Sequence, residues 1–462
     1  MSSPSTPKAV VKEQLKHSLS DNDEAVNSGA KLKAPTSQQN EDETTVETAD
    51  IAESSESRKR KHDGDGDERE SQKPMLAKSN PTGETSTSGI PSDLSTGSGR
   101  DIVEPENQAT DHTKVVTQHY NALEEKGLSQ RAQSRIIFMR NFNNWIKSML
   151  INEFLEKLRQ SSSQGSALKV LDMCCGKGGD LLKWKKANIA HLICADIADV
   201  SIEQCETRYK DIENRSKNDR GFAPLFSSEF LVADCTKVRL REKYRDPSVL
   251  LDLVSCQFAL HYSFETLPQA ECMMQNAAET LRAGGYFIAS IPDAYDLVSR
   301  WKKIDGNKFG NDIFNVEFLI EKENIPLFGA KYNFHLEGVV DCPEFLVYLP
   351  LLKKLARKYG LEMVMFERFD AFYNRMKDEG RSLLGNMQAL ETYPPYHEAP
   401  LLGQGPADYL HAIQYMQNST GHRKIGTLSH SEWDATSLYA VVAFQKMRTT
   451  WNSEGKPEYC KL

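Results

Sequence analysis

The sequence predicts an α/β fold, in which a mostly parallel sheet carries helices on both faces, preceded by a disordered N-terminal tail. From residue 168 onward, short apolar stretches of strand length alternate with stretches of helical spacing, which is typical of parallel sheets. Residues 1–119, in contrast, hold no aromatic residue and no cysteine. Such a segment cannot bury enough apolar surface to offset the entropy of ordering. We therefore expect an acidic tail over residues 1–115 and one folded domain over residues 116–462.

The charge of the chain is concentrated in the predicted tail. The 462 residues include 57 Lys+Arg and 65 Asp+Glu, a net charge of -8. Residues 1–119 alone carry 14 basic and 22 acidic residues, so the rest of the chain is balanced. Any site for a polyanion in the folded part must therefore be a local basic patch.

Several classes of protein are disfavoured. No run of about 18 apolar residues occurs, so we expect no membrane span. The N-terminal segment MSSPSTPK lacks the apolar region of a secretory signal. The nine cysteines have uneven spacing without paired CxxC clusters. We interpret them as reduced thiols of an intracellular protein, with neither a disulfide framework nor a metal site.

One basic run, Arg58–Lys61, interrupts the acidic tail. Four consecutive cations in an accessible segment favour a nuclear localisation signal that an import receptor reads, although a solvated charge run is the alternative. We therefore expect a nuclear protein.

Apolar spacing predicts the elements of the folded part. Residues 136–158 repeat apolar side chains at helical steps, and Asn143 and Asn144 suggest a polar elbow between two helical pieces. We then expect strands over residues 168–175, 191–197, 230–235, 251–259 and 286–291, with helices over 179–187, 200–215 and 270–282. The last of these helices is expected to end at Gly284-Gly285. Later elements are a helix over 343–359, strands over 361–366 and 438–444, and an irregular or partly helical lobe over about 374–424.

A glycine-rich turn follows the first predicted strand, in the run Val170–Asp180. In open parallel sheets, ligands bind beyond the carboxyl ends of the strands. Asp196 follows the second strand, 20 residues after Gly176, where a carboxylate suits a ribose diol. Asp234 follows the third strand and can accept a hydrogen bond from an adenine amine, although a turn or cap role is its default interpretation.

Two ligands compete for this turn. A dinucleotide requires a full GxGxxG and a pyrophosphate at the helix N-terminus. Here Asp172 and Asp180 flank the turn, and carboxylates oppose a pyrophosphate but suit a sulfonium and an amino group. The pattern favours S-adenosylmethionine, and with it a class I methyltransferase fold of Rossmann-like type.

Five motifs, in this order, resemble the eukaryotic mRNA cap guanine-N7 methyltransferases, and look most like the vertebrate enzymes. They are Asn-Phe-Asn-Asn-Trp at 141–145, Cys-Gly-Lys-Gly-Gly-Asp-Leu-Leu-Lys-Trp at 175–184, Asp-Ile-Ala-Asp-Val at 196–200, Cys-Gln-Phe-Ala-Leu-His-Tyr at 256–262 and Phe-His-Leu-Glu-Gly at 334–338. The resemblance covers roughly residues 116–446. It implies methyl transfer from S-adenosylmethionine to N7 of the guanine cap of nascent RNA.

The resemblance also implies the site residues. Those expected to hold the cofactor are Lys147, Cys174, Gly176, Gly178, Asp196, Asp234, Gln257 and Tyr262. Those expected to hold the cap are Asn143, Asn144, Lys177, Lys183, Arg208, His261, Glu337 and Tyr439. In the family the turn normally begins with Gly where this chain has Cys174. A Cβ there would crowd the methionine moiety, or would force a shift of the backbone if the position needs a positive φ. The family further implies capped RNA, a small activating protein and the transcription and capping machinery as partners.

The chemistry requires no general base, because guanine N7 already has an in-plane lone pair. We therefore predict recognition residues and no indispensable proton carrier, with the rate coming from alignment and exclusion of water. Glu337 would accept hydrogen bonds from guanine N1–H and N2–H2, while Lys177, Lys183 and Arg208 would face the triphosphate. A methyltransferase for tRNA or a small molecule, a non-catalytic cap-binding module and, less favoured, an oxidoreductase are the alternatives.

Overall fold

The computed structural model describes residues 112–122, 133–161, 167–218, 225–396, 399–419, 421 and 423–461. Residues 1–111, with the predicted signal Arg58–Lys61, lie outside the described residues. The first described element is helix α2 (His112–Ala122), so the predicted boundary between residues 115 and 116 falls inside a helix. None of the described helices is long and apolar enough to cross a membrane.

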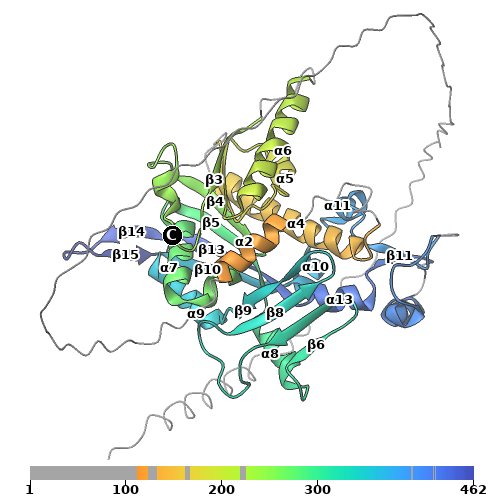
Figure 1. Cartoon of the computed structure of the whole chain (residues 1–462). Helices are drawn as coiled ribbons and strands as arrows, with labels where there is room; N and C mark the ends of the chain where they lie inside the picture. Colours follow the sequence, from red (N-terminus) through yellow and green to blue (C-terminus); the bar gives the residue numbers. More distant parts are fainter. Residues whose placement is uncertain are drawn as a thin grey trace, which may run out of the picture. The chain divides into compact units, whose positions relative to one another are not determined.

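A seven-stranded sheet forms the centre of the fold, in the order β10-β13-β5-β4-β1-β2-β3 (Figure 1). The strands are β1 (Lys169–Met173), β2 (His191–Asp196), β3 (Ser227–Val232), β4 (Leu251–Gln257), β5 (Leu281–Pro292), β10 (Leu361–Arg368) and β13 (Tyr439–Lys446). The first five pair in parallel, and β13 runs antiparallel between β5 and β10. The predicted mostly parallel sheet is confirmed.

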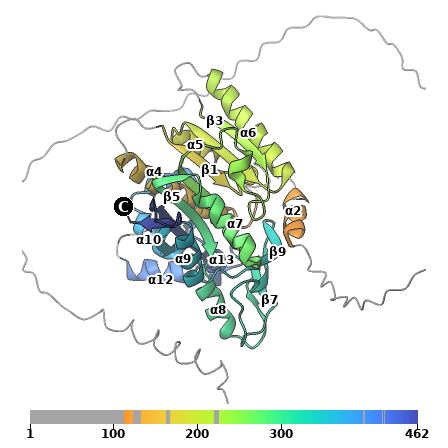
Figure 2. The same ribbon diagram turned by 90° about the vertical axis from the view of Figure 1, so that its left-hand side faces the viewer.

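Both faces of the sheet are covered, because successive strand residues point to opposite sides. Val170 and Leu192 enter one apolar cluster, while Leu171 and Ile193 enter the other. The first cluster contains side chains of α4 (Ile137–Ser161), α5 (Leu181–Lys186) and α6 (Asp199–Asn218). The second contains side chains of α7 (Leu267–Ala278) and α9 (Leu349–Lys358), which Figures 1 and 2 show away from α4.

The predicted polar elbow within residues 141–144 is wrong, because α4 is one continuous helix of 25 residues. Its two asparagines are fixed by tertiary contacts. Thr436 Oγ1 donates to Asn143 Oδ1, and Lys183 Nζ donates to Asn144 Oδ1, each at 2.5 Å. These contacts override the poor intrinsic helix propensity of asparagine.

The predicted helix end at Gly284-Gly285 is also wrong. Helix α7 ends at Ala278, and both glycines lie within β5. The β4–β5 register shifts there, since Leu251 pairs with Leu281 whereas Leu253 pairs with Tyr286. Gly284 has φ +80°, and a Cβ on Gly285 would lie 2.8 Å from the Asp252 carbonyl oxygen. The glycines therefore form an irregularity inside a strand, and they do not cap a helix.

A second, four-stranded antiparallel sheet was not foreseen. It comprises β6 (Lys308–Gly310), β7 (Phe314–Phe318), β8 (Lys331–Leu336) and β9 (Val340–Phe345), paired in that order. Strands β7 and β8 alternate strictly between buried and partly exposed residues, the period-two signal of a half-buried strand. Pro343, expected at a helix start, lies in β9, and the helix begins only at Leu349.

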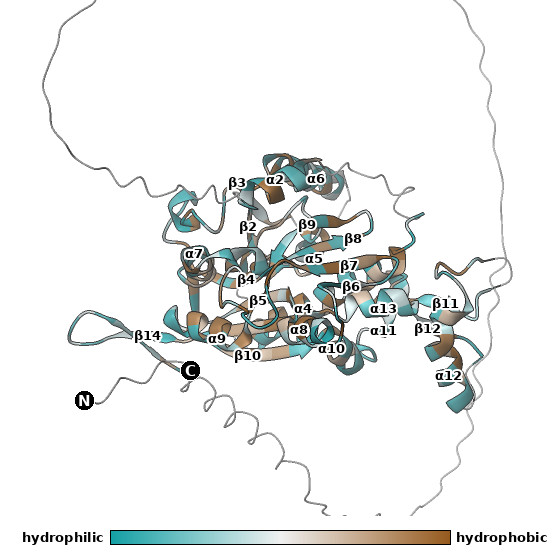
Figure 3. Cartoon of the chain, turned by 60° about the horizontal axis from the view of Figure 1, so that its bottom comes forward, coloured by the Kyte–Doolittle hydropathy of each residue, from teal (hydrophilic) through white to brown (hydrophobic). Residues whose placement is uncertain are grey.

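The stretch predicted as an irregular or partly helical lobe contains several short elements. They are α10 (Phe369–Met376), α11 (Arg381–Asn386), β11 (Glu391–Tyr393), a 3-10 turn (Pro406–Tyr409) and α12 (Leu410–Asn418). Strand β12 (Ile425–Thr427) and α13 (His430–Thr436) follow. The described chain ends in an exposed hairpin of β14 (Arg448–Trp451) and β15 (Pro457–Cys460), whose loop is hydrophilic in Figure 3.

Glu432 of α13 joins two helix starts, and its side chain is buried. Its carboxylate accepts the Ser429 N–H at 3.1 Å as half of a capping box. It also accepts the Met139 N–H, in the first turn of α4, at 3.1 Å. Both donors lie at helix starts, where an N–H has no intrahelical partner.

We predict that Glu432→Ala lowers the free energy of unfolding by about 2–4 kcal/mol, because two buried N–H groups lose their acceptor. Glu432→Gln keeps one acceptor oxygen and should cost about half as much. Urea denaturation measures both. Glu454→Ala, at an exposed carboxylate of the terminal hairpin, is the control, and an equal loss in Glu432→Ala and the control would contradict this role.

Candidate functional site

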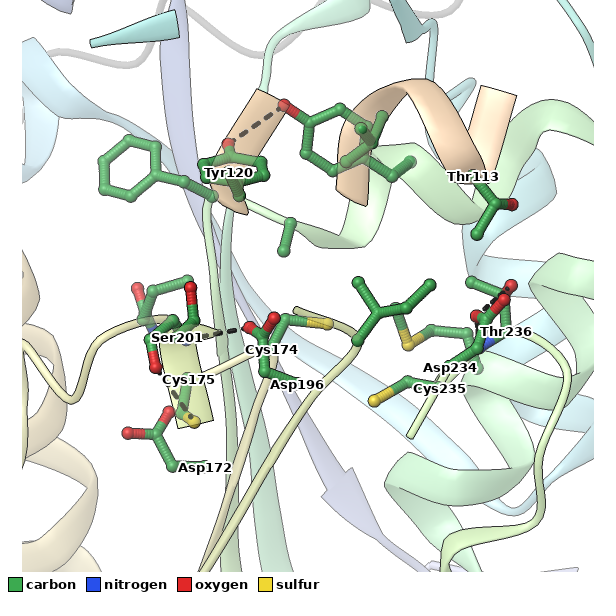
Figure 4. Close-up of a pocket in the computed structure, with 18 of the residues that line it drawn as sticks. Thr113, Tyr120, Asp172, Cys174, Cys175, Asp196, Ser201, Asp234, Cys235 and Thr236 are labelled. Atoms are coloured by element: carbon green, nitrogen blue, oxygen red, sulfur yellow. Dashed lines mark hydrogen bonds between the residues drawn. The ribbon is translucent and has the colours of Figure 1, made fainter. Parts of the chain in front are cut away.

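A cavity of about 280 Å³ lies at the carboxyl ends of the central strands (Figure 4). β1 pairs with β4 on one side and with β2 on the other, so the strand order reverses here. This reversal is where ligands bind in open parallel sheets. The lining residues from the strand ends include Cys174, Asp196, Asp234 and Gln257.

Helix α2 forms the opposite wall, which sequence reasoning missed. Figure 4 shows Thr113 and Tyr120 on this helix, across the cavity from Cys174 and Asp196. The Tyr120 and Tyr262 hydroxyls lie 3.3 Å apart, and His112 Nδ1 lies 2.5 Å from a Glu265 carboxylate oxygen. The one feature of the sequence that could have indicated this wall is that Tyr120 is the first aromatic residue of the chain.

Asp196, at the end of β2, fixes the glycine turn. Its carboxylate accepts the Gly176 N–H at 2.8 Å and the Ala198 N–H at 2.9 Å. Burial raises the pKa of Asp196, and these two backbone donors act against that rise. The side chain lines the cavity, so unused lone pairs of a carboxylate are available to hydroxyl donors.

Asp234 lines the cavity from the loop after β3, and Gln257 lines it as the last residue of β4. Thr236 donates its backbone N–H and its hydroxyl to Asp234 Oδ1, at 2.9 and 2.6 Å. Gln257 Nε2 donates to Ser255 Oγ at 3.0 Å. Gln257 Oε1 is buried and has no hydrogen-bond partner among the described residues. A buried acceptor without a donor is costly, so this oxygen suits a ligand that brings an N–H or O–H.

The surroundings of Asp180 and Asp172 shift the pKa values of their carboxyl groups in opposite directions. Asp180 lies 2.9 Å from Lys147 Nζ and 2.6 Å from Lys183 Nζ. Burial alone would raise the pKa of Asp180, but the two ammonium groups lower it to about 2. Burial and the Asp180 carboxylate raise the pKa of Asp172 to about 8.

Both acids line the cavity, but their surroundings reduce the negative charge that they bring to it. Burial and the Asp180 carboxylate favour the protonated form of Asp172, whose carboxyl group accepts the Trp184 Nε1–H at 3.0 Å. Asp180 is neutralised by Lys147 and Lys183. The acidic character that favours a cationic ligand depends instead on Asp196 and Asp234.

Every second residue of the glycine turn has a left-handed backbone conformation: Cys174 has φ +58°, Gly176 has φ +52° and Gly178 has φ +72°. Of the two expectations for Cys174, the structure shows the positive φ. Gly178 does not line the cavity; a Cβ on it would lie 2.7 Å from Cys205 Sγ. Beneath the turn, hydrogen bonds from the Cys175 and Cys194 thiols lower the pKa of Cys205 to about 5.

The eight residues expected to hold the cofactor are thus brought together except for Gly178, which supports the turn from behind. Lys147 lines the cavity, but its ammonium is already bound to Asp180. Tyr262 lines the cavity, and its hydroxyl lies 3.4 Å from Glu344.

The residues expected to hold the cap fall into separate groups. Asn143, Asn144 and Lys183 lie together where α4, α5 and α13 meet, through the contacts described above. His261 and Tyr439 gather around Glu344, a buried carboxylate that sequence reasoning missed. His261 Nε2 lies 3.2 Å from a Glu344 oxygen, and burial, together with the Glu344 charge, raises the pKa of Tyr439.

The remaining three expected cap residues are less buried. Lys177 lies in the glycine turn and Arg208 on α6, each partly exposed. Glu337 is exposed in the turn between β8 and β9, where its N–H donates to the Ile313 carbonyl oxygen at 2.9 Å. These three residues lie on three separate elements of the fold.

Comparison with known proteins agrees with the resemblance of the motifs. Residues 103–447 match the mRNA (guanine-N(7))-methyltransferase domain family. The mRNA cap guanine-N(7) methyltransferase of Drosophila melanogaster is 53% identical over 348 residues, which span 75% of this chain and 80% of that protein. The Caenorhabditis elegans protein of the same name is 41% identical over 344 residues, or 72% of this chain and 87% of that protein.

Among solved structures, the CcbJ methyltransferase of Streptomyces caelestis matches with a TM-score of 0.38 and 10% identity, over 66% of this chain and 95% of that one. An S-adenosylmethionine-dependent methyltransferase of Clostridium acetobutylicum matches with a TM-score of 0.33 and 15% identity, over 50% of this chain and 83% of that one. The extent and identity of the sequence matches show that this chain belongs to the mRNA (guanine-N7)-methyltransferase family.

Proposed function

We propose that this protein transfers the methyl group of S-adenosylmethionine to N7 of the terminal guanosine of capped RNA, with the cofactor in the cavity described above. Family membership supports the reaction, and two ring contacts between cavity residues and expected cap residues support its location. Phe258 and Tyr262 line the cavity. Phe258 also packs on Tyr439, with ring centroids 5.1 Å apart, and Tyr262 packs on His261 at 4.4 Å. Residues expected to hold the two substrates therefore share one wall.

The cavity residues suit the cofactor. When bound, S-adenosylmethionine supplies a methyl group on a positively charged sulfur. Asp196 presents lone pairs to a ribose diol, and Asp234 offers carboxylate lone pairs as acceptors. Gln257 Oε1 is an acceptor that needs a donor. A cavity of about 280 Å³ is near the lower end of the range for small-molecule sites.

The chain's own residues orient the acceptor base without moving a proton. Glu337 accepts from guanine N1–H and N2–H2, which selects guanine over adenine. Tyr439 and Phe258 supply an aromatic wall against the base. Because N7 attacks with its own lone pair, the buried Glu344 and His261 serve to hold the wall in place. Alignment and exclusion of water then account for the rate.

Lys177 and Arg208 are the proposed triphosphate contacts. Lys183 has a different role in this proposal, because its ammonium already bonds to Asp180 and Asn144. Lys183 holds Asn144 of α4 in place and stabilises the ionised form of Asp180.

Two alternatives make different use of the same structure. A methyltransferase for another RNA or a small molecule would use the cavity but not Glu337 or Tyr439. A non-catalytic cap-binding module would not use the cavity, and calorimetry would then detect no binding of S-adenosylhomocysteine.

Glu337→Ala distinguishes the cap reaction from the first alternative. Losing a bidentate contact to a base costs about 1–3 kcal/mol, so we expect transfer to GpppG-capped RNA to fall by about tenfold to 100-fold. The assay uses labelled S-adenosylmethionine and digestion to identify the methylated atom. Glu323→Ala, at another exposed carboxylate, is the control.

Calorimetry on the same Glu337 variant should show unchanged binding of S-adenosylhomocysteine. Equal activity of Glu337→Ala and the control, or a label on any atom other than guanine N7, would contradict the proposal.

Cys174 provides a test of the turn. A left-handed conformation costs a non-glycine residue about 1–2 kcal/mol, while glycine loses about 0.5–1 kcal/mol through its greater freedom when unfolded. The reference is Cys174→Ala, which keeps the strained backbone but lacks the sulfur. We predict that the free energy of unfolding of Cys174→Gly is about 0.5–1 kcal/mol higher than that of this reference. Denaturant titration of both variants decides this, and a less stable Cys174→Gly would refute it.

The proposal also includes a nuclear location and partners. The basic run Arg58–Lys61 suits an import receptor, and the family suggests a small activating protein and the capping machinery. We predict that replacing all four residues of this run by alanine retains the protein in the cytoplasm. Fluorescence microscopy of the tagged full chain would rule the signal out if nuclear fluorescence were unchanged.

A further inference from the structure

Three cysteine thiols meet beneath the glycine turn. Cys175 follows β1, Cys194 lies in β2 and Cys205 lies on α6, and their sulfur atoms are all within 4.8 Å of one another. The nine cysteines of the chain are free thiols, and the proposed methyl transfer uses none of these three.

The fold itself brings the three sulfurs together. β1 and β2 pair in parallel, so that Asp172 lies opposite Cys194, and the Cys175 N–H donates to the Ala195 carbonyl oxygen at 3.1 Å. Cys205 comes from the helix that packs on β2 and β3 and belongs to the same apolar cluster as Cys194. Gly178 leaves room for it, because any side chain there would meet the Cys205 sulfur.

We propose that Cys175, Cys194 and Cys205 form a three-thiolate site for a soft metal ion, with monovalent copper as the best match. Thiolates select soft ions such as monovalent copper and zinc. Zinc prefers four ligands, and among the described residues the group contains no fourth Cys, His, Asp or Glu. Monovalent copper accepts three ligands, and each thiol that binds it releases its proton.

The spacing of the sulfurs fits such an ion. With metal–sulfur bonds of about 2.3 Å, three sulfurs around a planar centre lie about 4 Å apart. The observed separations of up to 4.8 Å need only small side-chain movements to reach this arrangement.

The site adjoins the cavity, which gives it a consequence for the cofactor. Cys194 and Cys205 are fully buried, whereas Cys175 lines the cavity, so the ion enters from that side. Gly176, next to Cys175, holds the N–H that Asp196 accepts. Drawing Cys175 toward a metal therefore disturbs the turn. This consequence, unlike the metal site itself, rests on the proposed cofactor pocket.

The test uses the reduced full-length chain under anaerobic conditions, titrated with monovalent copper against a chromogenic copper chelator. We expect one copper per chain and at least a tenfold loss of affinity in Cys194→Ala. Cys272→Ala, at a partly exposed thiol of α7 outside the cluster, is the matched control and should bind as wild type does. No stoichiometric binding, or equal affinity in the two variants, would overturn the site.

X-ray absorption on the wild-type protein keeps the test decisive if Cys194→Ala does not fold. Three sulfur scatterers at about 2.3 Å support the site, and two or fewer contradict it. None of these measurements involves RNA or methyl transfer, so their failure is distinct from failure of the proposed function.

Saturating S-adenosylhomocysteine should weaken copper binding, and copper should weaken its binding by the same factor. An unchanged copper affinity would refute the coupling to the cavity.

Discussion

The position of β1 between β4 and β2 is the constraint on which the site depends. Because the strand order reverses there, the chain leaves β1 and β4 in opposite directions along the sheet, and a cavity remains at their carboxyl ends. The bond from the Gly176 N–H to Asp196 closes the base of this cavity by tying the turn after β1 to the end of β2. Every strand-derived group proposed to hold the cofactor comes from such an end, so a single feature of topology assembles residues from distant parts of the chain.

Buried charged side chains in this site are paired with neighbours of opposite charge. A domain with equal numbers of acidic and basic residues can therefore offer neighbouring sites to a cationic cofactor and to a polyanion. Asp180 holds two lysines from different helices, and one of them also fixes Asn144. Removing one partner of such a buried group leaves the other uncompensated, which is strongly unfavourable. The residues beneath the cofactor turn and those at the expected cap side are therefore one connected network.

The sequence predicted the alternating strands and the turn because period and glycine spacing are local signals. It failed where tertiary contacts override local preference. Asn143 and Asn144 lie inside a helix since Thr436 and Lys183 bind them, and Gly284-Gly285 form an irregularity in β5.

Among the site residues, motifs supplied the strand-end acids and Gln257. They did not supply the α2 wall, the central Glu344 or the three-thiol cluster. The spacing of Cys175, Cys194 and Cys205 follows no motif, because only the β1–β2 pairing and the packing of α6 bring them together.

The central claim is that the cavity and the cap-binding surface share the wall of Phe258 and Tyr262, so that the two ligands meet there. A crystal structure of the full chain with S-adenosylhomocysteine and GpppG tests it most directly. The account predicts the thioether sulfur in the cavity beside Asp196, with guanine N7 directed toward it and the base edge on Glu337. A guanine bound away from Glu337 and Tyr439, or with N7 turned from the sulfur, would contradict it.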